Sequence, residues 1–432
     1  MKRIVASVGL VALGASCIQS ASAQGFLKGP DGSKPWSVSA TLRGFYDDNV
    51  SSIPDDFPLA PGEEEDSFGF EISPAARFVW DMQQTMISLD YKYSYKYFDN
   101  RPVYNDDHND QSHTFNAILS HAFNERYAIR ASDSFVLGQE PDLLRAGDTF
   151  ATFQRISGDN IRNYGQIAFD ADLTRLFAAE VGYANVYYNY DDDGPGSRSA
   201  YLDRLEHSVR LDGKWKVSPT TTGILGYTYN QVDYTADELI GYGLGGVDVN
   251  PYYSDVRNSR SHYFYAGVDH AFTPDLSGSL RAGGRYIDFY NDPSGESTVS
   301  PYVRGSLRYF YAPESFVEGG LGYDRTPTDV AFNPTAADLT LDADTFTIFG
   351  TVSHKIASKL YGSLTAQFQN TAFNGGYADG ETEQIYLVGV QLEYRINQYL
   401  ASHVGYNFDK LESDLGRSFD RNRVYVGVTA SY

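Results

Sequence analysis

The sequence has only one cysteine, Cys17, among its 432 residues. Everything after that position is therefore without disulfides, cysteine nucleophiles or cysteine-ligated metals. Long hydrophobic runs are also missing beyond the N-terminal region, so no membrane-spanning helix is expected. Basic residues are the minority, with 34 Lys and Arg against 56 Asp and Glu and a net charge of −22. This balance excludes general affinity for nucleic acid, which needs a basic face.

The first residues have the features of an export signal. Lys2 and Arg3 precede a short apolar stretch, Ile4 to Leu13, and Ala21-Ser22-Ala23 forms a small-x-small cleavage site. We therefore expect residues 1–23 to be a cleaved signal peptide and residues 24–35 to be a short periplasmic tail. The expected destination is the outer membrane.

Alternation with period two runs through the rest of the chain. From Thr85 to Tyr97, apolar and aromatic residues alternate with polar residues, and the same pattern returns at Leu205–Val217 and Val299–Tyr311. His207 is the exception on the apolar side of the second segment. A period of two with one apolar and one polar face predicts β-strands. The final segment alternates in the same way and ends at Tyr432.

Short turns and long polar loops separate these segments in strict alternation. Eight short turns and nine long loops imply eighteen antiparallel strands, with sixteen as the fallback. Pro74 and the poorly alternating stretch 259–272 weaken two of them. The predicted fold is an all-β, up-and-down transmembrane β-barrel over residues 36–432, with the short turns at the periplasmic side. A propeller or a soluble sandwich is disfavoured, because it would bury the charged strand faces without water.

The sequence contains no catalytic or cofactor motif in a context that would let it function. Gly241 to Gly246 matches the dinucleotide pattern G-x-G-x-x-G, but no helix is expected after it, so we interpret it as a flexible external loop. His121, His270 and His354 lie just before turns, which favours interfacial anchors over catalysis. The acidic loop clusters lack the spacing of a calcium loop. We expect neither an enzyme, nor a cofactor, nor a bound metal.

Charged side chains on the polar strand faces are the candidate functional residues. A wide barrel has an aqueous interior, where such charges can set selectivity. A mutually paired ladder that only braces the wall is the open alternative. Arg281, Arg285, Arg304 and Arg308 are expected on two adjacent strands, near Glu318 of the next. The predicted pore-lining set is Lys92, Lys96, Arg210, Lys214, Arg281, Arg285, Arg304 and Arg308, with the carboxylates Asp90, Glu180, Glu206, Asp212, Glu318 and Glu393.

Several stretches resemble the putative β-barrel porin family 2. They are Gly44-Phe45-Tyr46-Asp47-Asp48-Asn49-Val50, Ser73-Pro74, Tyr91-Lys92-Tyr93-Ser94-Tyr95, and the segment from Ser112-His113 to His121-Ala122-Phe123. The resemblance covers most of the chain after the signal and implies an outer-membrane barrel with a porin-like layout. It supplies no active or binding residue to carry over.

The expected function is a porin-like channel for passive diffusion of small hydrophilic solutes. Two alternatives stay open: the duct of an exopolysaccharide export system, or an adhesion or structural barrel. A sugar duct calls for inward aromatic residues, and Tyr302, Phe310 and Tyr361 are the candidates. The expected partners are outer-membrane lipid and lipopolysaccharide, polysaccharide in the duct alternative, and the barrel assembly machinery. Resemblance to other outer-membrane barrels implies that this machinery reads the strand ending at Tyr432.

Overall fold

The computed structural model describes residues 34–59, 61–101, 108–139, 158–245, 248–293, 295–328, 330 and 339–432. The predicted signal peptide and all but the last two residues of the predicted tail lie outside this part of the chain. Every predicted pore-lining residue lies inside it.

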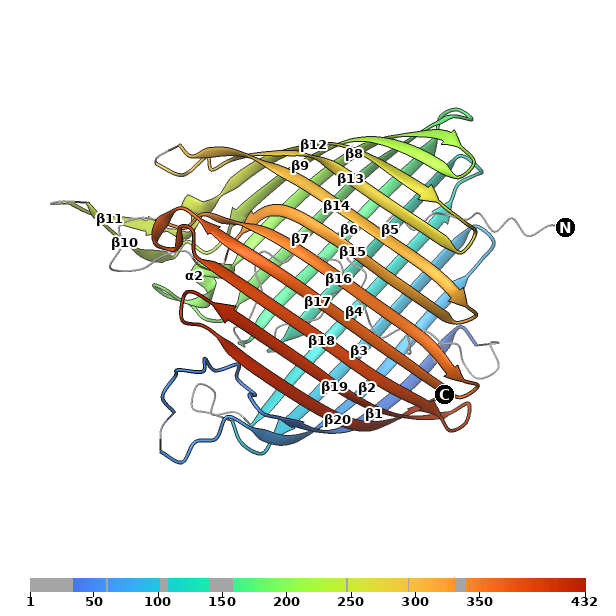
Figure 1. The fold of residues 1–432 in the computed structure, drawn as a ribbon, viewed down its shortest axis with the longest axis horizontal. Coiled ribbons are helices and arrows are strands. Elements are labelled where there is room, and N and C mark those ends of the chain that lie inside the picture. The colour runs from blue at the N-terminus through green and yellow to red at the C-terminus, as the bar shows by residue number, and fades with distance from the viewer. Residues whose placement is uncertain are drawn as a thin grey trace.

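Eighteen long strands form one antiparallel sheet that closes on itself (Figure 1). Each barrel strand pairs with the next along the chain, β9 pairs with β12, and β20 returns to β1. The prediction of an eighteen-stranded antiparallel barrel is therefore confirmed, and the sixteen-stranded fallback is not needed. The barrel strands are β1 (Trp36–Asp47), β2 (Ser67–Asp81), β3 (Thr85–Phe98), β4 (Asn109–Ala122), β5 (Tyr127–Gly138), β6 (Asn160–Asp172), β7 (Phe177–Tyr190), β8 (Arg204–Ser218), β9 (Thr221–Tyr234), β12 (Ser259–Ala271), β13 (Leu276–Asp288), β14 (Ser297–Ala312), β15 (Ser315–Pro327), β16 (Asp342–Ala357), β17 (Leu360–Asn374), β18 (Thr382–Arg395), β19 (Leu400–Ser413) and β20 (Phe419–Ser431).

The first and last barrel strands meet at the short-turn end of the barrel, where β1 begins and β20 ends (Figure 1). There the backbone N–H of Val38 donates to the carbonyl of Tyr432 at 3.0 Å, and the N–H of Tyr432 donates back at 2.8 Å. Further along the same seam, β1 and β20 pair from Ser39–Ser431 to Asp47–Arg423. Closure pairs the backbone groups of both terminal strands, which would otherwise be open edges.

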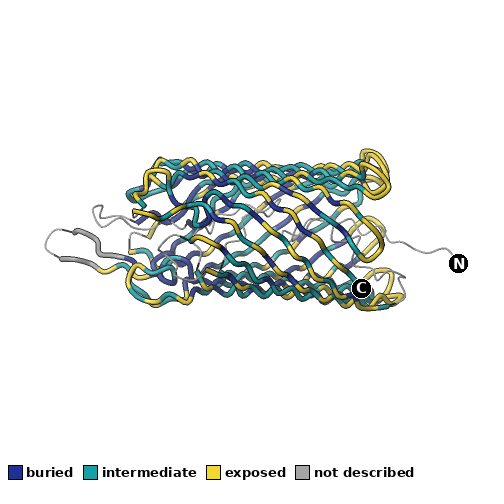
Figure 2. The backbone as a smooth tube through the Cα atoms, turned by 90° about the horizontal axis from the view of Figure 1, so that it is seen from below, coloured by how far each residue is buried: buried dark blue, intermediate teal, exposed yellow. Residues whose placement is uncertain are grey.

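Each strand has one outer and one inner face. Leu225, Val299 and Trp215 share the outer face and are 73%, 74% and 63% exposed, while inner-face residues such as Ser94 and Glu180 are buried. The alternation of exposed and buried positions runs along the strands in Figure 2. Exposed apolar side chains around the whole outside are what a lipid-facing barrel requires.

The two weak segments also form strands. β2 continues through Pro74, which faces outward opposite Ala40 of β1. In β12 the consecutive aromatic residues separate by face: Tyr265 is buried on the inner face, whereas Phe264 is 63% exposed outside. Inner and outer positions therefore alternate in β12 as in the other strands, but the sequence does not show it because both faces carry aromatic rings.

Close packing of inner rings explains part of the high glycine content. The ring of Tyr265 on β12 lies over Gly226 of β9, where an added Cβ would sit 2.1 Å from a ring carbon. The ring of Tyr425 on β20 lies over Gly405 of β19 in the same way, at 2.2 Å. Glycine at these positions leaves the space that the neighbouring ring fills.

The long external loops contain structure that the sequence did not predict. The loop expected at 191–202 holds helix α2 (Arg198–Leu202), and the loop expected at 235–258 holds the hairpin β10 (Leu239–Gly245) and β11 (Asp248–Tyr253). The glycine run that we interpreted as a flexible loop is therefore a strand up to Gly245. Two short 3-10 helices, η1 (Ser254–Arg257) and η2 (Gly376–Ala378), complete the elements.

The external loops share a hydrophobic core of their own. Its buried side chains come from three separate connections and from the end of β13: Ile240, Val256, Ile287, Phe289, Leu339 and Leu341. No helix among the described residues is long and apolar enough to cross a bilayer.

Candidate functional site on the inner wall

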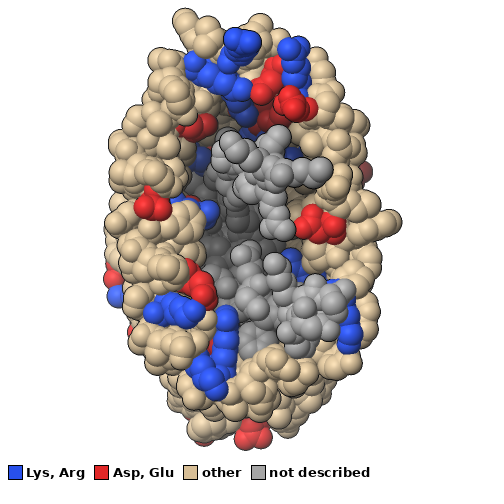
Figure 3. Space-filling model, turned by 90° about the vertical axis from the view of Figure 1, so that its right-hand side faces the viewer, with Lys and Arg blue, Asp and Glu red and all other residues tan. Residues whose placement is uncertain are grey.

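Side chains that contact each other across one or two intervening strands identify the concave inner face. The Tyr263 hydroxyl on β12 donates to Asp324 of β15 at 3.2 Å, passing over β13 and β14. The Tyr265 hydroxyl donates to Asp212 of β8 at 2.6 Å, passing over β9. Such reach is possible only on the side where the sheet curves inward. Seen from the short-turn end, the described residues form an oval ring with Lys, Arg, Asp and Glu side chains around its mouth (Figure 3).

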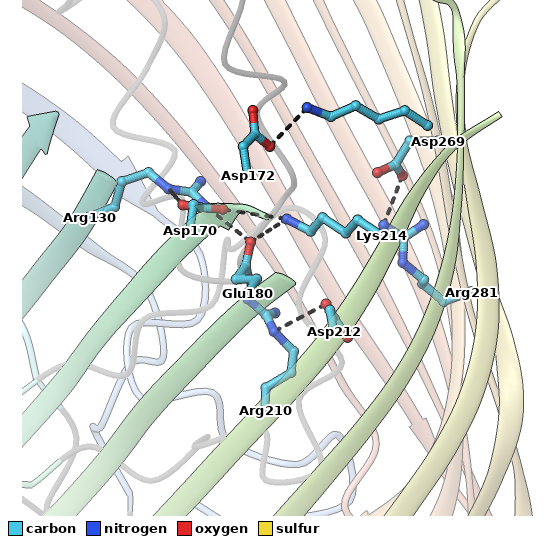
Figure 4. Close-up of polar contacts among 10 residues, drawn as sticks. Arg130, Asp170, Asp172, Glu180, Arg210, Asp212, Lys214, Asp269 and Arg281 are labelled. Carbon is cyan, nitrogen blue, oxygen red and sulfur yellow. Dashed lines mark hydrogen bonds and ion pairs between the residues drawn. The ribbon is translucent and has the colours of Figure 1, made fainter. Parts of the chain in front are cut away.

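Glu180 on β7 is the centre of a charge network on this face (Figure 4). Its side chain is fully buried, and it receives cations from the strands on both sides. Arg130 of β5 lies 3.1 Å away, Lys214 of β8 lies 2.5 Å away, and Arg210 of β8 also pairs with it. Three cations around one carboxylate satisfy a buried charge that would otherwise be costly.

The network continues along the wall with both signs in balance. Asp170 of β6 contacts Arg130 at 2.8 Å and Lys214 at 3.5 Å. Asp212 lies 3.5 Å from Arg210. Two more pairs lie beside it, Lys216–Asp172 at 2.8 Å and Arg281–Asp269 at 2.8 Å (Figure 4). The wall from β5 to β13 thus presents alternating charges instead of one sign.

The four predicted arginines lie on the inner faces of β13 and β14, which pair directly with each other. Arg281 and Arg304 are register partners. The carboxylates that pair with these arginines include Asp269 and Asp324 as well as Glu318. Arg285 lies 3.3 Å from Asp324 and donates to Ser261, and Arg308 pairs with Glu318.

Most other members of the predicted set also have partners of opposite charge. Their contacts are Lys92–Glu71 at 3.6 Å, Asp90–Arg77 at 3.1 Å, Glu206–Arg204 at 2.7 Å and Glu393–Arg395 at 2.9 Å. Lys96 is in register with Glu71 on one side and Asp110 on the other. The structure therefore brings these residues together as a paired wall.

Two carboxylate centres escaped the sequence analysis. Glu71 of β2 is buried, contacts Arg43 at 3.1 Å and accepts hydrogen bonds from Ser73 and Ser94 at 2.6 and 2.8 Å. Inner-face parity alone could have selected Glu71, because Phe70 and Ile72 face outward. Its partners depend on strand register, which the sequence does not reveal.

The second missed centre is Asp47, at the seam between the first and last strands. Its carboxylate accepts from Arg421 at 2.6 Å and from Arg423 at 2.7 Å, both on β20. The Asp47 side chain is completely buried. Since the partners are 374 and 376 residues away along the chain, no local pattern could indicate the pairing.

The three aromatic candidates for a sugar path share the inner face but are not one surface. Tyr302 packs edge-on against Tyr263 with centroids 5.3 Å apart. Phe310 is 50% exposed and lies 5.9 Å from the Phe316 ring. Tyr361 is covered by the Arg395 guanidinium at 3.8 Å.

Four histidines singled out from the sequence lie on the outer face, where each forms a hydrogen bond with a hydroxyl group. Their Nδ1 atoms contact Thr85 (His121, 2.7 Å), Thr221 (His270, 2.8 Å), Tyr311 (His354, 2.9 Å) and Tyr183 (His207, 2.8 Å). These pairs suit anchoring at membrane interfaces, where a ring can be apolar on one side and wet on the other. The described residues contain no cluster of three or more His, Cys, Asp or Glu suited to a metal ion.

The model of the family described as Putative beta-barrel porin 2 matches residues 39–432. The chain belongs to this family. Family membership and the closed eighteen-stranded barrel make it an outer-membrane porin channel. No curated protein matches the chain.

Several solved outer-membrane proteins are similar to this porin at low identity. OpdK from Pseudomonas aeruginosa is 14% identical with a TM-score of 0.42, covering 92% of this chain and 99% of its own. A BenF-like porin from Pseudomonas fluorescens Pf-5 is 9% identical with a TM-score of 0.43, with coverage of 92% and 99%. OccAB4 from Acinetobacter baumannii is 12% identical with a TM-score of 0.42 and the same coverage.

Proposed function

We propose that this porin lets small hydrophilic solutes diffuse passively through the barrel, without enzymatic activity. The observation that carries the proposal is the continuous wall of paired charges on the inner face, centred on Glu180 and on the arginines of β13 and β14. Opposite charges at fixed positions along a wet passage favour polar solutes and create local fields that orient them.

Single-channel recording in planar bilayers tests this proposal. The purified protein should give stepwise conductance in salt solution. A protein that inserts into the bilayer but never conducts, even with its external loops trimmed, would refute passive diffusion.

Two matched sets of variants test whether the wall biases selectivity. Changing Arg281, Arg285, Arg304 and Arg308 to Gln leaves Asp269, Asp324 and Glu318 without their partners, so the reversal potential should shift toward cations. The opposite set, Asp269→Asn, Asp324→Asn and Glu318→Gln, should shift it toward anions. If neither set moves the reversal potential from that of the parent, the pairs only brace the wall.

Export and assembly form a separate part of the proposal. We expect residues 1–23 to be removed, so N-terminal sequencing of the outer-membrane protein should begin at Gln24. The barrel assembly machinery would recognise β20 and its terminal Tyr432, and lipid and lipopolysaccharide would cover the apolar outer face. Deletion of β20 should therefore abolish insertion.

A polysaccharide duct and an adhesion barrel are less favoured, because the family match is to porins. The inner aromatic residues Tyr302, Phe310 and Tyr361 are the features that a sugar duct would use. Oligosaccharides that block the current of the parent, but not of a Phe310→Ala variant, would revive that alternative.

A further inference from the structure

One outward-facing carboxylate lies where lipid is expected. Asp133 is in the middle of β5 (Tyr127–Gly138), on the same face as Ile129 and Phe135, and it is exposed. On the other described barrel strands, outward-facing carboxylates lie within two residues of a strand end, as with Asp233, Asp288, Asp344, Glu412 and Asp420. Asp133 is therefore at a different depth from all of them.

Asp133 ends a row of hydrogen-bonded side chains across three strands. The Asn163 amide on β6 donates to both of its oxygens, at 3.0 and 3.1 Å. The Asn185 amide on β7 donates to the Asn163 carbonyl oxygen at 3.2 Å. We call Asp133, Asn163, Gly165 and Asn185 the amide–carboxylate patch.

Gly165 is the centre of this patch. It is in register with Asp133 on β5 and with Asn185 on β7. A Cβ at this position would lie 2.4 Å from the Asn185 side-chain oxygen and 3.1 Å from an Asp133 oxygen. The glycine therefore permits the polar side chains to converge over the outside of the sheet.

The surroundings of the patch are apolar. Phe115, Ile167 and Val181 are 46%, 43% and 49% exposed on the same outer surface. The described residues of β4 to β8 place no Lys or Arg on that surface. An ionised carboxylate accepts up to about four hydrogen bonds, and hydrocarbon supplies none. The two contacts from Asn163 leave part of this capacity unused, so Asp133 calls for a further polar partner within the membrane.

We propose that the amide–carboxylate patch is the contact surface of a two-fold symmetric dimer of this chain. A two-fold contact places the same patch on both sides, so the amide groups of one copy can meet Asp133 of the other. Outward-facing cations in the described strands, Arg260, Arg325 and Lys410, lie within three residues of the external strand ends. A head-to-tail contact at mid-membrane would therefore press Asp133 against an apolar wall. This inference rests on the fold and not on which solute passes.

The chain is well suited to a cross-linking test, because Cys17 is its only cysteine. Ile167→Cys places a thiol next to Gly165 on the same outer face. After oxidation in vesicles, this variant should run as a disulfide-linked dimer that reduction separates, since residues near a two-fold axis meet their own copies. The parent should give no such dimer.

A matched control lies on the opposite side of the barrel. Leu364 on β17 faces outward and is 41% exposed, close to the 43% of Ile167. In the closed strand order β6 is sixth and β17 is fifteenth, nine strands apart in a ring of eighteen. Leu364→Cys should not cross-link. Equal cross-linking of both variants would mean random collision and would overturn the proposal.

Removal of the charge distinguishes a specific contact from mere proximity. Combined with Ile167→Cys, Asp133→Leu should lower the cross-linked fraction at least tenfold, whereas Asp133→Asn should retain a measurable fraction. Single-channel conductance shows in each case that the barrel has folded. Conducting Ile167→Cys protein that never cross-links, cross-linking unaffected by Asp133→Leu, or a three-copy assembly by native mass spectrometry would each contradict the dimer.

Discussion

The inner wall and the external loops bury opposite kinds of side chain. On the inner wall the buried centres are carboxylates such as Glu180 and Glu71, each surrounded by cations. In the loops the buried centre is apolar and includes Phe289 and Leu339. The difference follows from what surrounds each region. Barrel strands direct their apolar side chains outward to lipid, so polar side chains face the interior. Loops in water bury apolar residues as a soluble domain does.

The largest loss of stability should come from removing the central carboxylate of the charge network on the inner wall. Glu180→Gln leaves Arg130, Arg210 and Lys214 crowded without their shared carboxylate. We expect the free energy of barrel unfolding to fall by about 4 kcal/mol, as for other buried ion pairs that lose one partner. Urea unfolding from lipid vesicles, followed by tryptophan fluorescence, measures it.

The matched control is Glu206→Gln, which removes the partner of a single cation, Arg204. Its loss should be clearly smaller. Equal unfolding free energies for Glu180→Gln and the parent would show that water screens the inner wall and that the network does not stabilise it.

Phe289→Ala, in the apolar core of the external loops, should lower the stability of these loops by about 3 kcal/mol, because removal of a buried ring leaves a cavity. The loss should be local. Hydrogen exchange should accelerate in the external loops while the urea midpoint of the barrel stays close to the parent value. Phe57→Ala, at an exposed loop ring, is the control. A barrel midpoint lowered as far as by Glu180→Gln would mean that loops and wall unfold together.

The smallest effect, about 2 kcal/mol, is expected at the seam. Asp47→Asn keeps the size of the side chain but weakens the charged hydrogen bonds from Arg421 and Arg423. Loss of resistance to unfolding in SDS on heating is the readout. In a double-mutant cycle, Arg421→Met should cost less in the Asp47→Asn background than alone. Strictly additive losses would argue against a specific contact.

Structural features that depend on residues close together in the sequence could be predicted, whereas features that depend on contacts between distant residues could not. The strands of the barrel were predictable because alternation, turn residues and loop lengths are all local signals. The eight short turns indicated by the sequence each separate two barrel strands in the structure. Even Pro74 and the three aromatics beginning at Tyr263 only obscured a period that the structure restores.

The remainder depended on contacts between distant segments. Parity placed Arg285 on the inner face, but its partner Asp324 lies on β15, two strands away, and becomes reachable only through the curvature of the wall. The loop core joins Ile240 to Leu339 across about a hundred residues, which no window of sequence can show. Hairpin β10–β11 was hidden because its glycines looked like a flexible segment.

The seam has a consequence for how the cell handles incomplete chains. Asp47 belongs to the first strand, and Arg421 and Arg423 belong to the last, so this carboxylate lacks both arginines until synthesis reaches the last strand. A product truncated before Arg421 would lose both arginines and would leave the edge of β1 unpaired at the same place. Only a chain that reaches the last strand can therefore close the sheet, and we expect truncated chains to remain open at β1.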